Sequence, residues 1–528
     1  MSSTYGVVDL FAGPGGLGEG FASAGPRGVH PFEIAISVER EKSAHRTLRL
    51  RAFIREVVRK SGRLPDSYVA FHAGRCAEPD WSKIDPDAWR LANAEARCLE
   101  LGDKATTTIL DAEIDRLRSG GHTDTILIGG PPCQAYSLVG RARSRGTEGY
   151  RPEDDHRHFL FREYIHVLDR LRPAAFVLEN VKGVLSSRVG GRQIFDEIMQ
   201  DIATLGGSDD EAYELFALKV ENGVVSLAKP ERPSDFIVRA EKHGVPQKRH
   251  RVIVIGVRSD LAPQAARARA AIDDTPCSVN EAIGNLPILR SGLSKIADGA
   301  AEWKAAVLAA AGQLLGMYDD DEEMARSLQK TIAEVADWHP AERTCSSLPE
   351  DYARSNKSLS QWLENEQLEA LAQHETRGHM ASDLRRYLFA SIFGRVRKKC
   401  AKKADYPPAL APSHESWEKN IFSDRFRVQL GDEAATTITS HISKDGHYFI
   451  HPDPSQCRSL TVREAARLQT FPDDYLFLGN RTQQYVQVGN AVPPYLARQI
   501  ADLLLNLLEG ATEKETGTAC KVEGVVCA

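Results

Sequence analysis

The chain has 528 residues, of which 42% are hydrophobic and 27% charged, and it carries a formal net charge of −6. This is the composition of a globular protein, and the length predicts two or three domains. No apolar run reaches the roughly 18 residues that a membrane span requires, and the N-terminus lacks the pattern of a secretory signal. The acidic balance excludes a surface uniformly adapted to nucleic acid, although a local basic face can still bind it.

The nine cysteines have no close regular spacing, which argues against a disulfide scaffold. No Cys-x-x-Cys pair or His/Cys cluster has the spacing of a zinc site. We therefore expect a cytoplasmic protein from a reducing compartment, with no structural metal.

Short apolar runs alternate with helical patterns in the N-terminal half of the chain. Runs of this length between helices indicate βαβ units, so we expect an α/β fold with a Rossmann-like, mostly parallel sheet. The predicted strands are Tyr5–Leu10, Ile34–Val38, Thr125–Ile128, Ala174–Leu178 and Arg251–Val257.

The strand–helix alternation stops at about residues 261–427, where we expect a second domain. This stretch contains a basic run, Arg385–Lys403, with no acidic residue inside it. The basic run is either a solvated helix face or a contact to a nucleic-acid backbone. The α/β pattern then returns with a helix at Thr461–Thr470, in which Thr461 and Glu464 have the spacing of a capping box.

A glycine-rich turn follows the first predicted strand, with the sequence DLFAGPGG at Asp9–Gly16. Glycines there let the backbone turn tightly and approach a ligand, with helix N–H groups pointing at it. By itself the pattern is equally compatible with an ordinary turn. Glu39 ends the next strand, where a carboxylate can accept hydrogen bonds from ribose hydroxyls, although a solvated loop glutamate is the simpler interpretation.

Cys133 lies in the segment GGPPCQAYS, directly after a predicted strand. Two prolines fix where its thiol points, and the polar loop that follows leaves it exposed enough to react. The alternative is a buried structural cysteine. Cationic surroundings favour a thiolate and also suit phosphate contacts. The loop at 140–158 supplies Arg141, Arg143, Arg145, Arg151 and Arg157.

Further charged and amide side chains lie at predicted strand and helix ends. Glu179, in the sequence ENV, is a candidate general acid or part of a turn-capping pair. In QKRHR, Arg249 and Arg251 alternate with the period of a strand and point the same way, which is also typical of a basic strand edge. Asn490, in GNAV, is by itself typical of a turn.

Taken in order, these segments closely resemble the DNA (cytosine-5)-methyltransferase family. FAGPGG, PPCQ, ENV, QKRHR and GNAV match the family signatures FxGxGG, PC, ENV, QxRxR and GNxV, and RSLTVREAARLQ matches the helix that precedes the last one. The match covers roughly residues 4–260 and 430–508. The stretch between them matches no family motif, which is typical of the variable target-recognition domain.

The resemblance implies a role for each matching residue. Cys133 would be the nucleophile, Glu179 would contact cytosine N3, and Arg249 and Arg251 would hold the base and its pocket. The implied cofactor is S-adenosylmethionine, whose site would be lined by Phe11, Gly13, Gly15, Gly16, Glu39, Pro132, Leu160 and Asn490. The loop after Cys133 is expected to close over a flipped-out base. Its phosphate contacts would be Arg141, Arg143 and Arg145.

The resemblance also implies a domain organisation. A catalytic domain is expected at 1–260, a target-recognition domain at 261–430, a return to the catalytic domain at 431–510, and a flexible tail at 511–528. The stretch between Glu39 and Cys133 is longer than in compact members, which predicts an insertion at about 41–104. The adenine-binding aspartate of the family is not evident there, and Asp111 is the nearest candidate by its distance ahead of Cys133.

Competing functions explain less of the sequence. An RNA cytosine-C5 enzyme is the main rival, because one branch of the family acts on tRNA, but the large variable domain favours double-stranded DNA. An amino-methyltransferase would need an Asp/Asn-Pro-Pro-aromatic motif, which GGPPCQ lacks. A silent DNA-binding regulator would not need Cys133 together with Glu179, and an NAD oxidoreductase would explain the glycine turn alone.

The position of the first motif bears on the biological setting. Because it lies at the start of the chain, we expect a bacterial or archaeal enzyme of a restriction–modification or other anti-phage system. We expect it to act as a monomer, with a restriction endonuclease or another defence protein as its partner.

Overall fold

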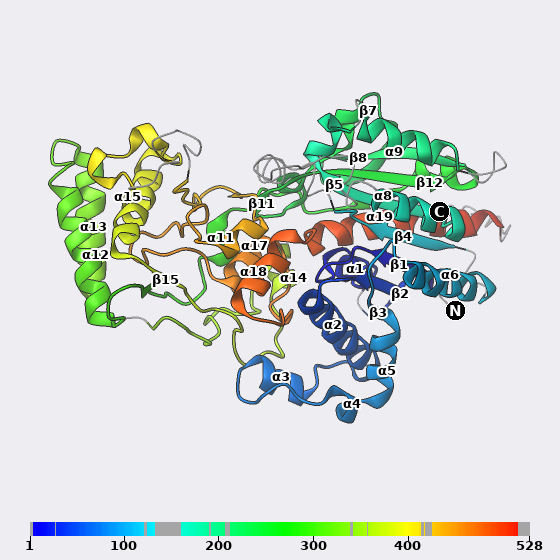
Figure 1. Cartoon of the computed structure of the whole chain (residues 1–528), viewed down its shortest axis with the longest axis horizontal. Coiled ribbons are helices and arrows are strands. Elements are labelled where there is room, and N and C mark those ends of the chain that lie inside the picture. Colours follow the sequence, from blue (N-terminus) through cyan, green and yellow to red (C-terminus); the bar gives the residue numbers. More distant parts are fainter. Residues whose placement is uncertain are drawn as a thin grey trace, which may run out of the picture.

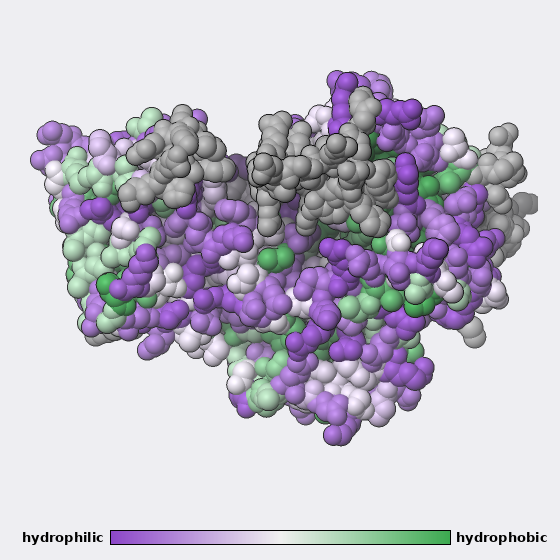
Figure 2. All heavy atoms as spheres, viewed as in Figure 1, coloured by the Kyte–Doolittle hydropathy of each residue, from purple (hydrophilic) through white to green (hydrophobic). Residues whose placement is uncertain are grey.

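The computed structural model has the chain arranged with a large sheet at one end and a group of helices at the other (Figure 1). The residues that it describes are 4–26, 28–120, 124–132, 160–189, 192–205, 212–337, 342–355, 357–412, 417 and 425–515. The surface seen in Figure 2 is mostly hydrophilic, with apolar residues in scattered groups. Among the described helices, none is long and apolar enough to cross a bilayer.

The main sheet has ten strands in the order β13-β9-β8-β12-β5-β4-β1-β2-β3, with β10 beside β12. Five neighbouring strands are parallel: β1 (Tyr5–Leu10), β2 (Phe32–Glu39), β3 (Ala96–Cys98), β4 (Thr125–Gly129) and β5 (Ala175–Val181). The antiparallel strands are β8 (Tyr213–Glu221), β9 (Val224–Ala228), β10 (Ile237–Arg239), β12 (His250–Arg258) and β13 (Arg269–Ala271). The expected α/β class is thus confirmed. Several predicted strand limits differ by one to three residues. The largest difference is in β5, which continues to Val181 and so includes Glu179, which the sequence places just after the strand.

Helices cover both faces of the parallel strands. Alternate residues of β1 show this: Val7 belongs to a core with α1 (Gly16–Ala22) and α19 (Pro494–Glu515), and Val8 to a core on the opposite face. That second core includes α6 (Lys104–Ser119), α8 (Leu160–Leu171) and α9 (Ile194–Ala203). Burial on both faces is why these strands are continuous apolar runs in the sequence.

The region after the sheet has a hydrophobic core of its own. The helices α12 (Ala300–Leu315), α13 (Glu322–Asp337) and α15 (Ala381–Arg397) pack together around Trp303, Leu328 and Tyr387. Figure 1 shows them at the end of the molecule away from the sheet. We call residues 279–457 the variable region. Its shorter elements are α11 (Val279–Ile283), α14 (Ser358–Leu363), β14 (Gly292–Leu293), β15 (Gly378–His379) and β16 (Ala435–Thr436).

The chain between β2 and β3 forms helices that lie beside the sheet and below the variable region in Figure 1. They are α2 (Lys42–Ser61), α3 (Asp66–His72), α4 (Trp81–Ile84) and α5 (Pro86–Glu95). Tyr68 Oη donates to the carbonyl oxygen of Asp474 at 2.6 Å, and His72 Nε2 lies 2.9 Å from that of Asp473. Leu64 N donates to the Gln367 side chain at 2.6 Å. These helices therefore support residues 473–474, where the chain returns toward the sheet, and they contact the variable region.

The returning chain joins the two ends of the molecule through α17 (Val462–Leu468) and α18 (Arg481–Asn490). The predicted capping box of α17 is confirmed: Thr461 Oγ1 accepts from Glu464 N, and the Glu464 carboxylate accepts from Thr461 N. Figure 1 shows both helices between the sheet and the helices of the variable region. The remaining described short elements are β6 (Arg188–Val189), β7 (Arg192–Gln193), β11 (Gln247–Lys248) and α10 (Ala262–Ala265).

Two buried ion pairs hold this junction together. Arg458 forms a two-pronged pair with Glu464 at 2.7 and 2.6 Å. Arg467 does the same with Asp473 at 3.0 and 2.6 Å. All four side chains are at most 2% exposed, so each charge depends on its partner.

Candidate active site at the carboxyl edge of the sheet

The parallel strands end side by side, and most of the predicted site residues lie where they end. Leu10 of β1 is in register with Gly129 of β4, and Gly129 with Leu178 of β5. Glu39 ends β2 beside Cys98 of β3. This is the edge at which α/β sheets bind their ligands.

The turn after β1 has an unusual backbone conformation. Phe11, Gly13 and Gly15 all have positive φ, at 57°, 58° and 101°. Glycine adopts these angles freely, whereas a phenylalanine pays roughly 1–2 kcal/mol. A Cβ added to Gly13 would meet no described atom within 4 Å. The turn therefore presents bare backbone to open space, and strain of this kind concentrates at ligand sites.

Glu39 holds the turn in place from the end of β2. One carboxylate oxygen accepts from Gly13 N at 2.9 Å and the other from Glu41 N at 2.6 Å. Burial raises the pKa of the Glu39 carboxyl, and these two N–H groups oppose the rise. Tyr475 Oη donates to the carbonyl of Pro14 on the other side of the turn. Each Glu39 oxygen keeps further lone-pair capacity for a ligand.

The end of α18 packs against the start of α1. A Cβ on Gly16 would lie 2.2 Å from the carbonyl oxygen of Val492, so this close approach requires glycine. Asn490, the last residue of α18, is exposed two residues earlier. The glycine turn and Asn490 are thus brought to neighbouring positions, although they are far apart in the sequence.

The second group of predicted residues centres on Glu179. Arg251 of β12 lies opposite Val181 of β5, and its Nε is 3.0 Å from Glu179 Oε1. Both side chains are 14% exposed, so the pair is accessible but largely screened from water. A Cβ on Gly130 would lie 2.8 Å from Glu179 Oε2. The chain leaving β4 therefore passes directly over this carboxylate.

Asn180 positions the same stretch of chain from β5. It is 6% exposed, and its Nδ2 donates to the Pro131 carbonyl at 3.5 Å. Pro132 is partly buried and is the last described residue before Cys133. Cys133, Arg141, Arg143 and Arg145 lie outside the described residues. Sequence reasoning missed this role of Asn180, because the ENV motif does not separate it from its neighbour Glu179.

Arg249 does not join the Glu179–Arg251 pair and is buried, at 2% exposure. It donates to the carbonyl of Ile438 at 2.8 Å and to that of Gly489 at 3.4 Å. Burial lowers its pKa well below the ordinary value, and the nearby charge of Arg251 adds to this. Arg249 thus supports two backbone segments at the edge.

Two other candidates lie on the helices beside the edge. Leu160 is the first residue of α8 and is partly buried. Asp111 lies seven residues into α6, where its Oδ1 is 3.3 Å from His166 Nε2 and 3.5 Å from Arg170 Nε, both on α8. A helix of that length carries Asp111 about 10 Å from its start. Asp111 thus contacts α8 and not the strand ends.

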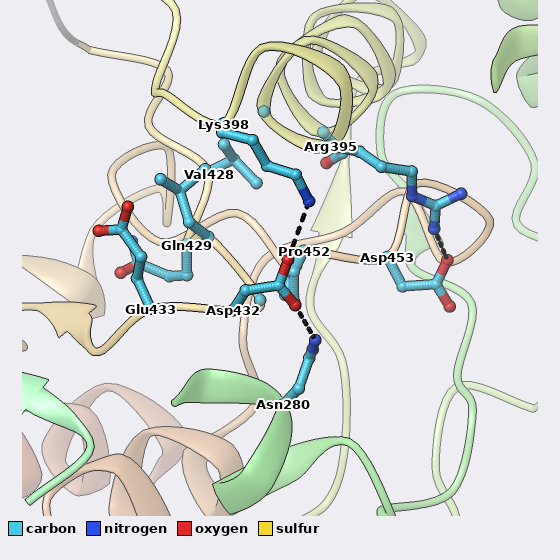
Figure 3. A pocket seen from close by; sticks show the side chains of 13 residues that line it. Asn280, Arg395, Lys398, Val428, Gln429, Asp432, Glu433, Pro452 and Asp453 are labelled. Atoms are coloured by element: carbon cyan, nitrogen blue, oxygen red, sulfur yellow. Dashed lines mark hydrogen bonds and ion pairs between the residues drawn. The ribbon is translucent and has the colours of Figure 1, made fainter. Parts of the chain in front are cut away.

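A polar hollow lies between the end of α15 and the segment 428–433 (Figure 3). Two members of the basic run point into it: Lys398 Nζ is 2.9 Å from Asp432, and Arg395 Nη2 is 3.4 Å from Asp453. The Lys398 and Asp432 side chains are 69% and 70% exposed. Other members of the run bond within the variable region, as Arg386 does to the Leu410 carbonyl.

Comparison with known proteins finds similarity along most of the chain. The profile of the C-5 cytosine-specific DNA methylases matches residues 82–506. The type II methyltransferase M.Bpa9945I of Bacillus paralicheniformis is 30% identical, over 96% of this chain and 99% of its own. The DNA (cytosine-5-)-methyltransferase M.ApeKI of Aeropyrum pernix is 27% identical over the same shares. The similarity therefore includes the sheet, the site and the variable region.

Proposed function

From the premise that this chain belongs to the C-5 cytosine-specific DNA methylase family, and is a DNA (cytosine-5-)-methyltransferase, we propose its substrates and chemistry. It transfers a methyl group from S-adenosylmethionine to C5 of a cytosine flipped out of a specific double-stranded DNA sequence. The observation that carries the proposal is the Glu179–Arg251 pair beside Gly130. Gly130 is three residues ahead of Cys133, and the pair lies on the same edge as the strained glycine turn.

The residues at the edge fit the cofactor. The open backbone at Gly13 can accept a close ligand, and Glu39 can accept ribose hydroxyls. Asn490 supplies an exposed amide next to the turn. The site would be completed by Phe11, Gly16, Pro132 and Leu160. S-adenosylmethionine, when bound, supplies an electrophilic methyl group.

Cys133 activates the base by covalent catalysis. Its thiolate adds to C6 of the cytosine, and the electrons of the C5–C6 double bond move into the ring toward N3. Glu179, as a carboxylic acid, gives N3 a proton, so no net negative charge builds up on the ring. The product is an enamine whose C5 is nucleophilic enough to accept the methyl group.

The reverse flow of electrons releases the product. A base, which water can provide, removes the proton from C5, and the electrons of that bond re-form the C5–C6 double bond. The S–C6 bond breaks, which returns the thiolate of Cys133, and the N3 proton goes back to Glu179. Throughout the reaction, Arg251 holds the Glu179 carboxyl toward the cytosine ring. Asn180 holds the Pro131 carbonyl ahead of Cys133.

The base must leave the duplex to reach these groups, at a cost of a few kcal/mol. Arg141, Arg143 and Arg145 would contact phosphates as the loop after Cys133 closes. The similarity to M.Bpa9945I, a type II methyltransferase, supports a role in restriction–modification or a related anti-phage system. A cognate endonuclease or another defence protein would then be the partner of a monomeric, cytoplasmic enzyme.

Methylation sequencing of DNA from a methylation-free host that expresses the chain tests this proposal. We expect 5-methylcytosine at one recurring sequence, and no mark with Cys133→Ser produced at the same level. Unmarked DNA from cells that contain folded wild-type protein would contradict the proposal. Parallel labelling of tRNA distinguishes the RNA-modifying alternative, which predicts methylated tRNA and unmodified duplex.

A further inference from the structure

A buried set of hydrogen bonds joins the two halves of the site. Gln247 and Gln469 are both fully buried, and Gln247 Nε2 donates to Gln469 Oε1 at 2.9 Å. Gln247 Nε2 also donates to the Leu468 carbonyl at 3.0 Å, and its Oε1 accepts from Ile438 N at 2.7 Å. Ile438 follows β16, inside the variable region.

The set continues to the backbone on both sides of Asn490. Gln469 Nε2 donates to the Val488 carbonyl at 2.6 Å and to the Ala491 carbonyl at 3.3 Å. Arg249 reaches the Gly489 carbonyl at 3.4 Å. A Cβ on Gly489 would lie 2.2 Å from Ser440 N, so the end of α18 also touches the segment after Ile438. The exposed Asn490 is therefore held by carbonyls that precede and follow it.

This set of residues is also close in sequence to Arg251 of the Glu179–Arg251 pair. Arg249 is two residues from Arg251, and its Nη1 donates to the Ile438 carbonyl at 2.8 Å. Ile438 is thus bound through its N–H by Gln247 and through its carbonyl by Arg249. A shift of Ile438 would move the supports of Asn490 and of Arg251 together.

We propose that Gln247, Gln469 and Arg249 are positioning residues that keep the cofactor site and the cytosine site in register. The proposal rests on the proposed function, which gives Asn490 to the cofactor and Arg251 to the base. Methyl transfer needs its two reactants aligned, and a displacement of about 1 Å can cost about 100-fold in rate. Buried amides suit this task because losing one leaves several backbone groups unsatisfied.

Gln469→Met tests the proposal, with Gln499→Met as the matched control. Gln499 is also buried and bonds through both ends of its amide, but to His243 and not to the segments around Ile438 and Asn490. Active sites are counted by trapping on 5-fluorocytosine duplex, so that misfolded protein does not enter the rates. For Gln469→Met we expect kcat/KM per active site to fall about 100-fold, with a raised KM for S-adenosylmethionine and an unchanged Kd for duplex. Gln499→Met should keep wild-type kinetics per active site.

Hydrogen exchange on the wild-type enzyme keeps the proposal testable if Gln469→Met does not fold. S-adenosylmethionine alone should slow amide exchange at residues 436–440, although none of them is assigned to the cofactor. Unchanged exchange there, with slower exchange at the glycine turn, would overturn the proposal. So would wild-type kinetics in Gln469→Met, or an equal loss in Gln499→Met. If the wild type methylates DNA, such a result refutes the positioning role alone; if it methylates none, the proposed function itself fails.

Discussion

The junction around α17 and the hollow beside α15 use the same kinds of ion pair in opposite environments. At the junction, the Arg467–Asp473 pair is at most 2% exposed. In the hollow, the Lys398–Asp432 pair is about 70% exposed (Figure 3). A buried charge that loses its partner remains unpaired in a low dielectric, whereas an exposed one is solvated by water. The buried pair at the junction therefore stabilises the fold, whereas the exposed pair in the hollow is free to exchange partners. The difference comes from burial and not from the pairing itself.

The largest expected effect comes from breaking the buried pair. Arg467→Met leaves the Asp473 carboxylate fully buried, with Tyr352 Oη at 3.1 Å and Arg463 Nη1 at 3.6 Å as its remaining partners. Because Arg463 still offsets part of the charge, we expect the free energy of unfolding to fall by about 3–4 kcal/mol, the lower part of the range for a broken buried pair, measured by urea denaturation at neutral pH. A loss no greater than that of Lys398→Met would show that the two regions do not differ in the way described.

The pH dependence of stability tests the brace formed by α3. Burial lowers the pKa of His72 to about 4, and the charge of Arg463 adds to this, so His72 stays neutral in the fold. In the unfolded chain it binds a proton near pH 6.5, so below that pH the unfolded state holds more protons. Stability should therefore be complete above about pH 6.5 and should fall as the pH drops toward 4, by up to about 3 kcal/mol from this group.

His72→Gln provides the comparison for this pH effect. Glutamine can still donate to the Asp473 carbonyl but does not titrate, so urea midpoints should change less between pH 7 and pH 5 than in the wild type. Parallel pH profiles for the two proteins would exclude His72 as a source of the acid sensitivity.

The smallest expected effect is in the hollow. Lys398→Met should change the free energy of unfolding by less than about 1 kcal/mol, because exposed pairs contribute little. The same urea series used for Arg467→Met measures it. A loss comparable to that of Arg467→Met would mean that the Lys398–Asp432 pair is a structural support.

Local patterns predicted the elements that are buried on both faces. Tyr5–Leu10 is a continuous apolar run because β1 is covered on both sides, and its predicted limits agree with the structure. The strands β8 and β9 were not predicted, because both mix buried with half-exposed and exposed positions and so lack a clear apolar run. The extension of β5 to Glu179 depends on pairing with β12, which a polar strand end does not reveal.

The site shows the same limit. The motifs placed Gly13, Glu39 and Glu179 at strand ends, since each lies at the end of a recognisable strand or directly after it. Contacts between distant parts of the chain, such as Tyr475 with Pro14 or Gln469 with Gln247, have no local signature. The position of Asp111 on α6 likewise depends on how α6 packs on α8. Sequence spacing alone could not exclude it from the edge.

The central proposal is that the thiolate of Cys133 bonds to the target cytosine. Duplex that carries 5-fluorocytosine at the recognised position tests it most directly, because fluorine cannot leave C5 as the proton does. With S-adenosylmethionine present, the wild-type protein should form a complex that survives denaturing electrophoresis, with the DNA attached to the peptide that contains Cys133. Cys133→Ser should form none. Absence of that complex with folded wild-type protein, or its persistence in Cys133→Ser, would contradict the account.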